Sequence, residues 1–296
     1  MIQLSKDISI SDILKNIRLS KKYIGSKKIK FDNIASFKNN NTKSLVFLTK
    51  EIFDTKLKKK FSSIKSKIII TDFEEKKLYR KNLIITKNSR HYLNKVIQYL
   101  NNQSLIKENI YKNSSSYFSK NIQIGKNVKI GQNVKIYPNV YLDNCVIGNN
   151  VIIGPNTSIG YKGLVRYKYK NLKLNLISIG KVVIKENVEI GSNCIIARGT
   201  IENTLINKDV IIGNNTNIGH NTNIDIQTEI SSGCKIGGGV IIKKNCFLGL
   251  GCKINPNTVI EKNNFIGVGS VVTKSTTKNS KLFGSPAKRI SFLKKK

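Results

Sequence analysis

The chain has 296 residues, of which 39% are hydrophobic, contains no tryptophan and carries a formal net charge of +35. Its lysines are scattered along the sequence and no RNA- or DNA-binding motif occurs, so we expect no nucleic-acid partner despite the charge. Without a signal peptide, an apolar run near the ~18 residues of a membrane span, or a CxxC pair among its five cysteines, we expect a cytoplasmic protein with no transmembrane segment.

The first third of the chain alternates β-rich runs with segments of helical periodicity. Short apolar runs bounded by polar residues predict strands at 44–49, 67–71 and 83–86. Apolar spacing predicts helices within 8–17, within 50–64 and over 89–100, the last with Ser89 as its N-cap. We therefore expect a small α/β domain at 1–105 and a linker at 106–121. His91 lies on the last of these helices, away from the other histidine, and is expected to be a surface or structural residue.

From residue 122 onward, an aliphatic residue recurs every six positions. The longest run without a slip consists of Ile206, Ile212, Ile218, Ile224, Ile230, Ile236, Ile242, Leu248, Ile254, Ile260, Ile266 and Val272. A fixed period of six is typical of a parallel β-helix, in which three hexads make one triangular coil. We expect residues 122–275 to form this solenoid, followed by a short tail at 276–296.

A second position, four residues after the aliphatic one, is occupied by small side chains. In the longest run it holds Val210, Thr216, Thr222, Thr228, Cys234, Val240, Cys246, Cys252, Thr258, Asn264 and Ser270. These side chains are expected to point inward near a corner of the coil. The cysteines at this position, Cys194 included, are therefore predicted to be packing residues and not nucleophiles or ligands, while a register slip leaves Cys145 undecided.

The repeat carries one histidine and one long interruption. His220 lies two residues after Ile218, a position that points out of the coil, and an exposed imidazole can accept a proton near neutral pH. Residues 161–180 break the six-residue count, and insertions in a solenoid form loops on one face, often the binding face. Zinc enzymes of this architecture need several histidines around the metal, so with His220 alone we expect no metal site.

These features resemble the hexapeptide-repeat acyltransferases, and within them the UDP-3-O-acylglucosamine N-acyltransferases of lipid A biosynthesis. The N-terminal runs "SLVFLTKEIFDTKL" and "NLIITKNSRHYLNKVIQYL" are similar to that family's uridine-binding domain. The stretch "VEIGSNCIIARGTIENTLINKDVIIGNNTNIGHN" is similar to its central region, and "GSPAKRI" to its closing segment. The resemblance implies a left-handed parallel β-helix preceded by a small α/β domain, assembled as a homotrimer.

The resemblance also implies an activity and its residues. His220 would be the general base that takes a proton from an attacking amine, and the backbone N–H of Gly238 would stabilise the oxyanion. The donor would be a 3-hydroxyacyl-acyl carrier protein and the acceptor a UDP-linked amino sugar, with no bound cofactor. The residues matched to substrate contacts are Phe47, Lys50 and Phe53 around uracil, and Asn221, Asn257 and Arg198 in the repeat.

The sequence departs from the family pattern at several of these positions. The acidic residue that precedes the family's histidine by seven is Gly213 here, its Asp-Arg-Gly is Ala197-Arg198-Gly199, and its second histidine aligns with Asn257. The second half of the repeat also resembles acetyl-CoA-dependent sugar acetyltransferases. Two alternatives therefore stay open: an acetyl-CoA-dependent transferase of surface glycan synthesis, and a non-catalytic paralogue.

Overall fold

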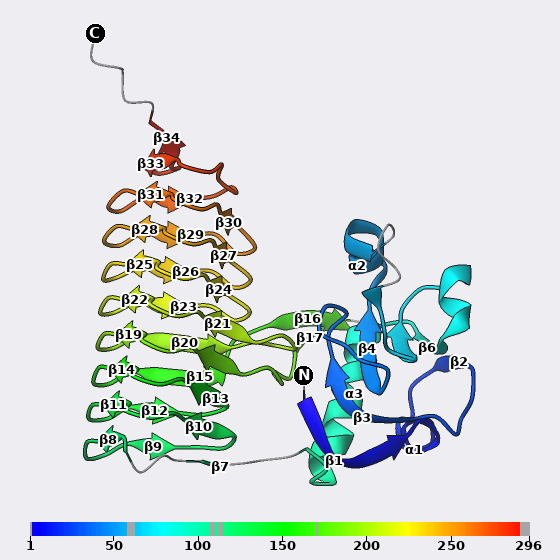
Figure 1. Cartoon of the computed structure of the whole chain (residues 1–296). Coiled ribbons are helices and arrows are strands. Elements are labelled where there is room, and N and C mark those ends of the chain that lie inside the picture. Colours follow the sequence, from blue (N-terminus) through cyan, green and yellow to red (C-terminus); the bar gives the residue numbers. More distant parts are fainter. Residues whose placement is uncertain (1, 58–62, 107–109, 112–114, 170, 291–296) are drawn as a thin grey trace. The chain divides into compact units, whose positions relative to one another are not determined.

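The computed structural model describes residues 2–57, 63–106, 110–111, 115–169 and 171–290 (Figure 1). The chain divides into two compact units: residues 1–107 with 164–179, and residues 108–163 with 180–296. Within the described ranges, no helix has the length and apolar character that crossing a membrane requires.

A six-stranded sheet forms the centre of the first unit. Its order is β1-β3-β4-β5-β6-β2, in which β3 to β6 are parallel while β1 and β2 pair antiparallel at the two edges. The strands are β1 (Ile2–Ser9), β2 (Lys21–Ile24), β3 (Lys30–Ala35), β4 (Ser44–Leu48), β5 (Ile68–Thr71) and β6 (Asn82–Thr86). All four residues of β5 are buried, as its unbroken apolar run requires in the middle of a parallel sheet. The strands predicted from the apolar runs are thus confirmed as β4, β5 and β6.

The helices of this unit lie where the sequence pattern predicts them, but one cap and one helix type differ from the prediction. They are α1 (Ile10–Asn16), α2 (Lys50–Ile52), a π-helical turn (Phe53–Leu57), a 3₁₀ helix (Lys76–Arg80) and α3 (Ser89–Asn102). The expected cap of α3 is wrong by one residue: Asn88 accepts the N–H of His91, while Ser89 Oγ donates to Asp72 Oδ2 at 3.0 Å. The helix predicted within 50–64 is α2 with its π turn, and residues 58–62 lie outside the described ranges.

The insertion expected as a loop at 161–180 contains an antiparallel hairpin, β16 (Arg166–Tyr169) and β17 (Leu172–Asn175), which clusters with the first unit. Helix α3 holds it. The His91 ring stacks on Tyr169 with centroids 3.9 Å apart, and His91 Nδ1 lies 2.9 Å from the Tyr167 hydroxyl. Asn94 accepts the N–H of Ile177 at 2.9 Å and donates to the same hydroxyl at 3.2 Å. His91 is therefore a structural residue, 6% exposed, that fixes the insertion.

This contact predicts a pH-dependent stability of the first unit. Burial, and next the positive charge of Lys95, lower the pKa of His91 below its ordinary value of 6.5. Below that value the unfolded chain binds a proton that folded His91 resists, so the free energy of unfolding falls as the pH drops from 6.5 towards the lowered pKa. Above pH 6.5 the stabilisation is complete. Thermal unfolding followed between about pH 7.5 and pH 5 measures the effect.

His91→Gln is the matched variant, because glutamine retains an acceptor for the Tyr167 hydroxyl but does not titrate. We expect it to lower stability by about 1–3 kcal/mol at neutral pH, from the lost stack and weaker hydrogen bond, and to flatten the pH dependence below 6.5. An unchanged slope in this variant would assign the pH dependence to other groups.

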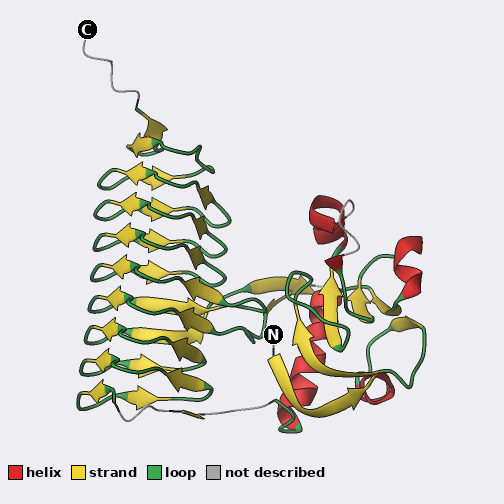
Figure 2. Ribbon diagram, in the orientation of Figure 1, coloured by secondary structure: helices red, strands yellow, loops and turns green. Residues whose placement is uncertain are grey.

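The second unit consists of three stacks of short parallel strands, as Figure 2 shows. The first stack contains β7 (Ile110–Tyr111), β10 (Val128–Ile130), β13 (Cys145–Ile147), β18 (Val182–Ile184), β21 (Thr204–Ile206), β24 (Asn223–Ile224), β27 (Ile241–Ile242) and β30 (Val259–Ile260). The second contains β8 (Tyr117–Phe118), β11 (Lys135–Ile136), β14 (Ile152–Ile153), β19 (Glu189–Ile190), β22 (Ile211–Ile212), β25 (Glu229–Ile230), β28 (Phe247–Leu248), β31 (Phe265–Ile266), β33 (Lys281–Phe283) and the antiparallel β34 (Lys288–Arg289). The third contains β9 (Gln123–Ile124), β12 (Tyr141–Leu142), β15 (Ser158–Lys162), β20 (Ile195–Arg198), β23 (Asn217–Ile218), β26 (Lys235–Ile236), β29 (Lys253–Ile254) and β32 (Val271–Val272).

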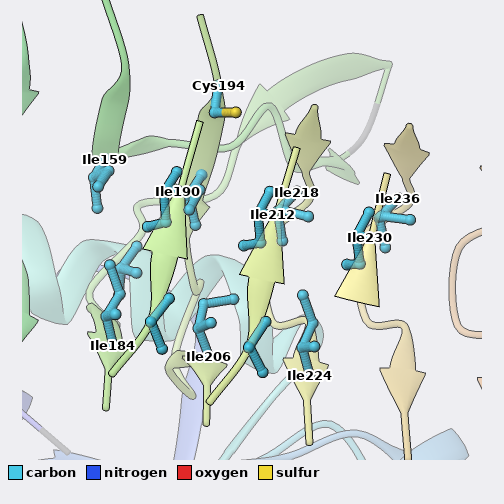
Figure 3. Close-up of a cluster of buried hydrophobic side chains, with 14 of the residues drawn as sticks. Ile159, Ile184, Ile190, Cys194, Ile206, Ile212, Ile218, Ile224, Ile230 and Ile236 are labelled. Atoms are coloured by element: carbon cyan, nitrogen blue, oxygen red, sulfur yellow. The ribbon is translucent and has the colours of Figure 1, made fainter. Parts of the chain in front are cut away.

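The hexad residues form the core of this left-handed β-helix. Figure 3 shows the stacked isoleucines, and every aliphatic residue of the longest run is at most 4% exposed. The residues at the small position are buried as well, which confirms the inward packing of the cysteines, and Cys145 joins them. Cys145 is fully buried, and burial raises the pKa of its thiol to about 12, which disfavours the thiolate that a nucleophile needs.

The abundant asparagines have a place in the same repeat. Most residues three positions after the aliphatic one adopt the left-handed backbone conformation, for example Asn150 at φ 58° and Asn187 at φ 58°. Asparagine tolerates this conformation better than most residues. Its side chain then bonds to the same position in the next coil, as Asn150 Nδ2 does to Asn187 Oδ1 at 3.1 Å.

Neighbouring isoleucines provide a direct test of the register. Ile212 is 1% exposed and Ile211 47% exposed. We expect Ile212→Ala to destabilise the solenoid by about 2–5 kcal/mol, through lost burial and an unfilled cavity. Ile211→Ala, the control, should change stability by less than about 0.5 kcal/mol. Equal effects of the two substitutions in thermal unfolding would contradict the register.

The solenoid extends beyond the expected boundary at residue 122. Strands β7 and β8, inside the segment expected as a linker, pair in parallel with β10 and β11. Phe118 explains the difference, because it stands six residues before Ile124 and packs against the same core with an aromatic ring in place of an aliphatic side chain. At the other end, β33 of the expected tail continues the second stack.

Candidate functional site

The departures from the six-residue period all lie at one corner of the coil, where the chain passes from the third stack to the first. Leu142 and Ile147 are five residues apart, Ile159 and Ile184 are 25 apart, and Ile196 and Ile206 are ten apart. We call this edge the irregular corner and define it by residues 143–144, 160–163, 180–181, 197–203, 219–222, 237–239 and 255–257. Deviations from a regular solenoid mark the parts of the coil that are not required for stacking, so this corner is the candidate site.

His220 lies on the irregular corner in the turn after β23 and is half-buried. Its Nδ1 lies 2.9 Å from Oδ1 of Asn221. The same Oδ1 accepts the backbone N–H of Thr200 at 3.1 Å and its hydroxyl at 2.9 Å. The Asn221 amide nitrogen donates to the carbonyl oxygen of Glu202 at 3.1 Å. One side of the imidazole is therefore held by a hydrogen-bonded group from the coil below.

Two glycines enclose the other parts of the ring. A Cβ atom on Gly238, in the coil above, would lie 2.4 Å from Nε2 of His220, and one on Gly163 would lie 3.1 Å from Cδ2. A side chain on Gly238 would collide with the imidazole in this position, and one on Gly163 would press against it. Nε2, the nitrogen away from Asn221, therefore lies directly beside the backbone of Gly238.

The N–H of Gly238 makes no hydrogen bond within the described part of the chain. At the second position after the aliphatic residue, some coils pair this N–H with a side chain one coil further on, as Ser192 does with Asn214 Oδ1 at 2.7 Å. The corresponding residue above Gly238 is Pro256, which has no acceptor side chain. An unpaired N–H beside an imidazole nitrogen is the combination that an acyl-transfer site requires.

Arg198 and Asn257 flank this pair on the same corner. Arg198 occupies the position of His220 one coil below; burial lowers its pKa, while the nearby carboxylate of Asp143 opposes that change. Its Nε is buried and, among the described residues, has no hydrogen-bond partner. Asn257 is exposed on the coil above Gly238, and its backbone N–H donates to the carbonyl oxygen of Gly238 at 2.9 Å. The solenoid thus brings together His220, Gly238 and the three repeat residues expected to bind substrate.

The residues expected to bind uracil lie in the first unit and are not equally accessible. Phe47 is half-buried on β4 and Lys50 is exposed at the start of α2. Phe53 is 2% exposed and packs against Phe73 with ring centroids 5.1 Å apart. In this conformation Phe53 therefore packs in the core of the first unit, and its contact with uracil stays a prediction.

A polar group that the sequence reasoning missed lies next to Lys50. Asp72 follows β5 and accepts the backbone N–H of Lys50 at 2.9 Å. A cavity of about 360 Å³ opens there, lined by Ser20, Lys21, Lys22, Asp72, Ile85, Thr86 and Lys87. The cavity lies at the carboxyl ends of β5 and β6. This position could have been predicted from the sequence, because ligands of parallel sheets bind at that edge.

Thr200 was also missed, although the sequence contains a signal for it. The ten-residue interval between Ile196 and Ile206 adds four residues to the corner directly below His220. The turn they form is tight, since a Cβ atom on Gly199 would lie 1.6 Å from the carbonyl oxygen of Glu202. No group of three His, Cys, Asp or Glu side chains that could hold a metal ion occurs in the described ranges.

Comparison with known proteins agrees with the repeat. Residues 127–161 match the family model "Bacterial transferase hexapeptide (six repeats)". No curated protein matches the chain at a significant level.

Several solved structures are similar to the chain. A UDP-N-acetylglucosamine acyltransferase from Bacteroides fragilis is 20% identical over 60% of this chain and 73% of its own, with a TM-score of 0.48. The corresponding enzyme from Francisella novicida is 24% identical over 61% and 68%, with a TM-score of 0.45. A variant of an N-acyltransferase from Bacillus cereus, solved with dTDP and coenzyme A, is 21% identical over 60% and 92%, with a TM-score of 0.32.

Proposed function

We propose that the protein is an N-acyltransferase that moves an acyl group from a thioester to the amine of a UDP-linked amino sugar. The observation that carries this proposal is the placement of His220 Nε2 beside Gly238, whose N–H is unpaired within the described residues. The match of residues 127–161 to the hexapeptide transferase model supports the reaction class. The donor is a 3-hydroxyacyl-acyl carrier protein, an acidic partner suited to a chain of net charge +35.

In the proposed reaction, the amine nitrogen attacks the thioester carbonyl carbon while His220 Nε2 takes one of its protons. The carbonyl oxygen becomes an oxyanion, and the N–H of Gly238 donates to it. The carbon–sulfur bond then breaks, the thiolate takes the proton from the imidazolium, and an amide and a thiol leave. The step forms one C–N bond and needs no acyl-enzyme, in agreement with the burial of all five cysteines.

The remaining residues of the irregular corner supply binding contacts. Arg198, whose buried Nε has no hydrogen-bond partner in the described part of the chain, suits an anionic or carbonyl group of the substrate. The side chains of Asn221 and Asn257 lie on the same edge, and Lys50 with the cavity at Asp72 is the nucleotide-binding candidate in the first unit. We further propose a cytoplasmic homotrimer in which the corner faces a neighbouring subunit.

A transfer assay with the purified protein tests the proposal. UDP-linked 2-amino sugars are offered with either a 3-hydroxyacyl-acyl carrier protein or acetyl-CoA, and the amide product is detected by mass. Product from the carrier protein supports the proposal. Product from acetyl-CoA alone would reassign the protein to glycan acetylation, and no product from either donor would favour a non-catalytic paralogue.

A further inference from the structure

We propose that Asn221 is the positioning residue of His220, and that Thr200 holds its amide oxygen in place of the carboxylate that the chain lacks. The role of this group in turnover rests on the proposed function, whereas its effect on the imidazole does not. The ring nitrogen that carries the proton follows from the hydrogen bonds of the irregular corner in two steps.

The first step identifies the atom that faces the ring. The backbone N–H of Thr200 can only donate, and it points to the Asn221 side-chain atom 3.1 Å away, so that atom is the amide oxygen. The opposite end of the amide lies 3.1 Å from the carbonyl oxygen of Glu202, which can only accept, so that end is the nitrogen. Two independent bonds thus fix the amide orientation.

The second step follows from the chemistry of the amide oxygen. Because Asn221 Oδ1 carries no hydrogen, the 2.9 Å contact with His220 Nδ1 is a hydrogen bond only if Nδ1 is the donor. A neutral imidazole has a single N–H, so Nε2 then has the free lone pair. Nε2 is the nitrogen beside Gly238, so the atom able to accept a proton lies next to the glycine whose N–H has no partner among the described residues.

The extended turn below His220 stabilises this hydrogen-bonded arrangement of Asn221 and the imidazole. Gly213, seven residues before the histidine, has no side chain that could orient the ring. The four additional residues after Ile196 carry Thr200 to Asn221 instead, and the N–H of Gly180 anchors the turn by donating to the carbonyl oxygen of Thr200 at 3.1 Å. The N–H of Asn221 is held in turn by Thr204 Oγ1 at 2.9 Å.

An amide and a carboxylate would position the ring equally but differ in charge. Asn221 fixes the tautomer without attracting the imidazolium that forms during the reaction, whereas an aspartate at this position would favour the charged ring. Asn221→Asp should therefore keep the tautomer and the activity within about tenfold, and shift the acidic limb of the pH–rate profile to higher pH.

Nitrogen NMR of protein labelled in its histidine rings tests the tautomer directly, because the chain has two histidines. We expect the two rings to be opposite tautomers. His220 carries its proton on Nδ1, whereas His91 carries its proton on Nε2, since Asn94 donates to the Tyr167 hydroxyl and leaves that hydroxyl to donate to His91 Nδ1. An Nε2–H tautomer at His220 would overturn the proposal whether or not the protein transfers acyl groups.

Asn221→Gly removes the amide oxygen and keeps the backbone, because Gly239 occupies the same position one coil above at φ 72° and Asn221 has φ 58°. We expect loss of the fixed Nδ1–H form and a decrease in kcat between about 10- and 10⁴-fold. Asn215→Gly, at the same φ of 58°, is the folding control. A tautomer unchanged in Asn221→Gly contradicts the positioning role, while a correct wild-type tautomer without any transfer would refute only the proposed function.

Discussion

Replacing His220 with asparagine is expected to lower kcat for acyl transfer by about 10²- to 10⁴-fold, which is the usual contribution of a general base. The side chain is half-buried on a turn outside the isoleucine core, and Asn221 Oδ1 keeps both of its bonds from Thr200. The thermal unfolding midpoint should therefore change little. Initial rates over a range of acceptor concentrations, together with a melting curve, measure both quantities.

His91→Gln is the internal control for this prediction. It alters the other histidine, which lies in the first unit and holds the insertion hairpin, so it should lower the stability of that unit and leave kcat close to the wild-type value. Full activity in His220→Asn would remove the general base from the proposed reaction. A large loss of stability in that variant would instead assign His220 to the solenoid framework.

The architecture of the repeat could be predicted because each hexad obeys the same local rules. One aliphatic side chain per six residues fills the interior, and the position four residues later accepts only small groups. The structure buries Ile218, Cys234 and Cys252 accordingly. The same counting placed His220 outside the core, since two residues after an inward isoleucine the chain is at a corner.

The contacts of non-repeating residues could not be predicted in this way. Phe53 was matched to uracil through the resemblance, but helical spacing reveals neither the π turn that begins at this residue nor the contact of its ring with Phe73. The partners of His91 lie in an insertion more than seventy residues away along the chain, as the spacing of 76 to Tyr167 shows. Pairing over such a distance depends on tertiary packing, for which the local pattern has no signal.

The irregular corner is an intermediate case. Its existence could be predicted from the intervals of 25 and ten residues between successive aliphatic positions. The bond from Thr200 to Asn221 could not, because a turn of additional residues has no register of its own. The candidate base was therefore predictable, whereas the group that orients it became visible only in three dimensions.

Adding one methyl group to Gly238 is expected to inactivate the site as effectively as removing the base. Its Cβ would lie 2.4 Å from Nε2 and 2.6 Å from Cε1 of His220, so the ring must leave its position and its bond to Asn221. The backbone itself accepts a side chain here, because His220 and Pro256 occupy the same position in the flanking coils. We expect Gly238→Ala to lower kcat by about 10²-fold or more, from a displaced base and a crowded oxyanion site.

The combination of Gly238→Ala with His220→Ala separates this clash from a general disturbance of the coil. Without an imidazole the three atoms closest to the added methyl group are gone, so the double variant should have the melting temperature and the residual rate of His220→Ala alone. In the wild-type background the half-exposed ring can swing into solvent, so the loss should fall on kcat and on the Nδ1–H signal of His220 more than on stability. If the double variant is instead much less stable than His220→Ala, the solenoid itself requires a glycine at position 238. The proposed role of Gly238 beside the reacting carbonyl then loses its main support.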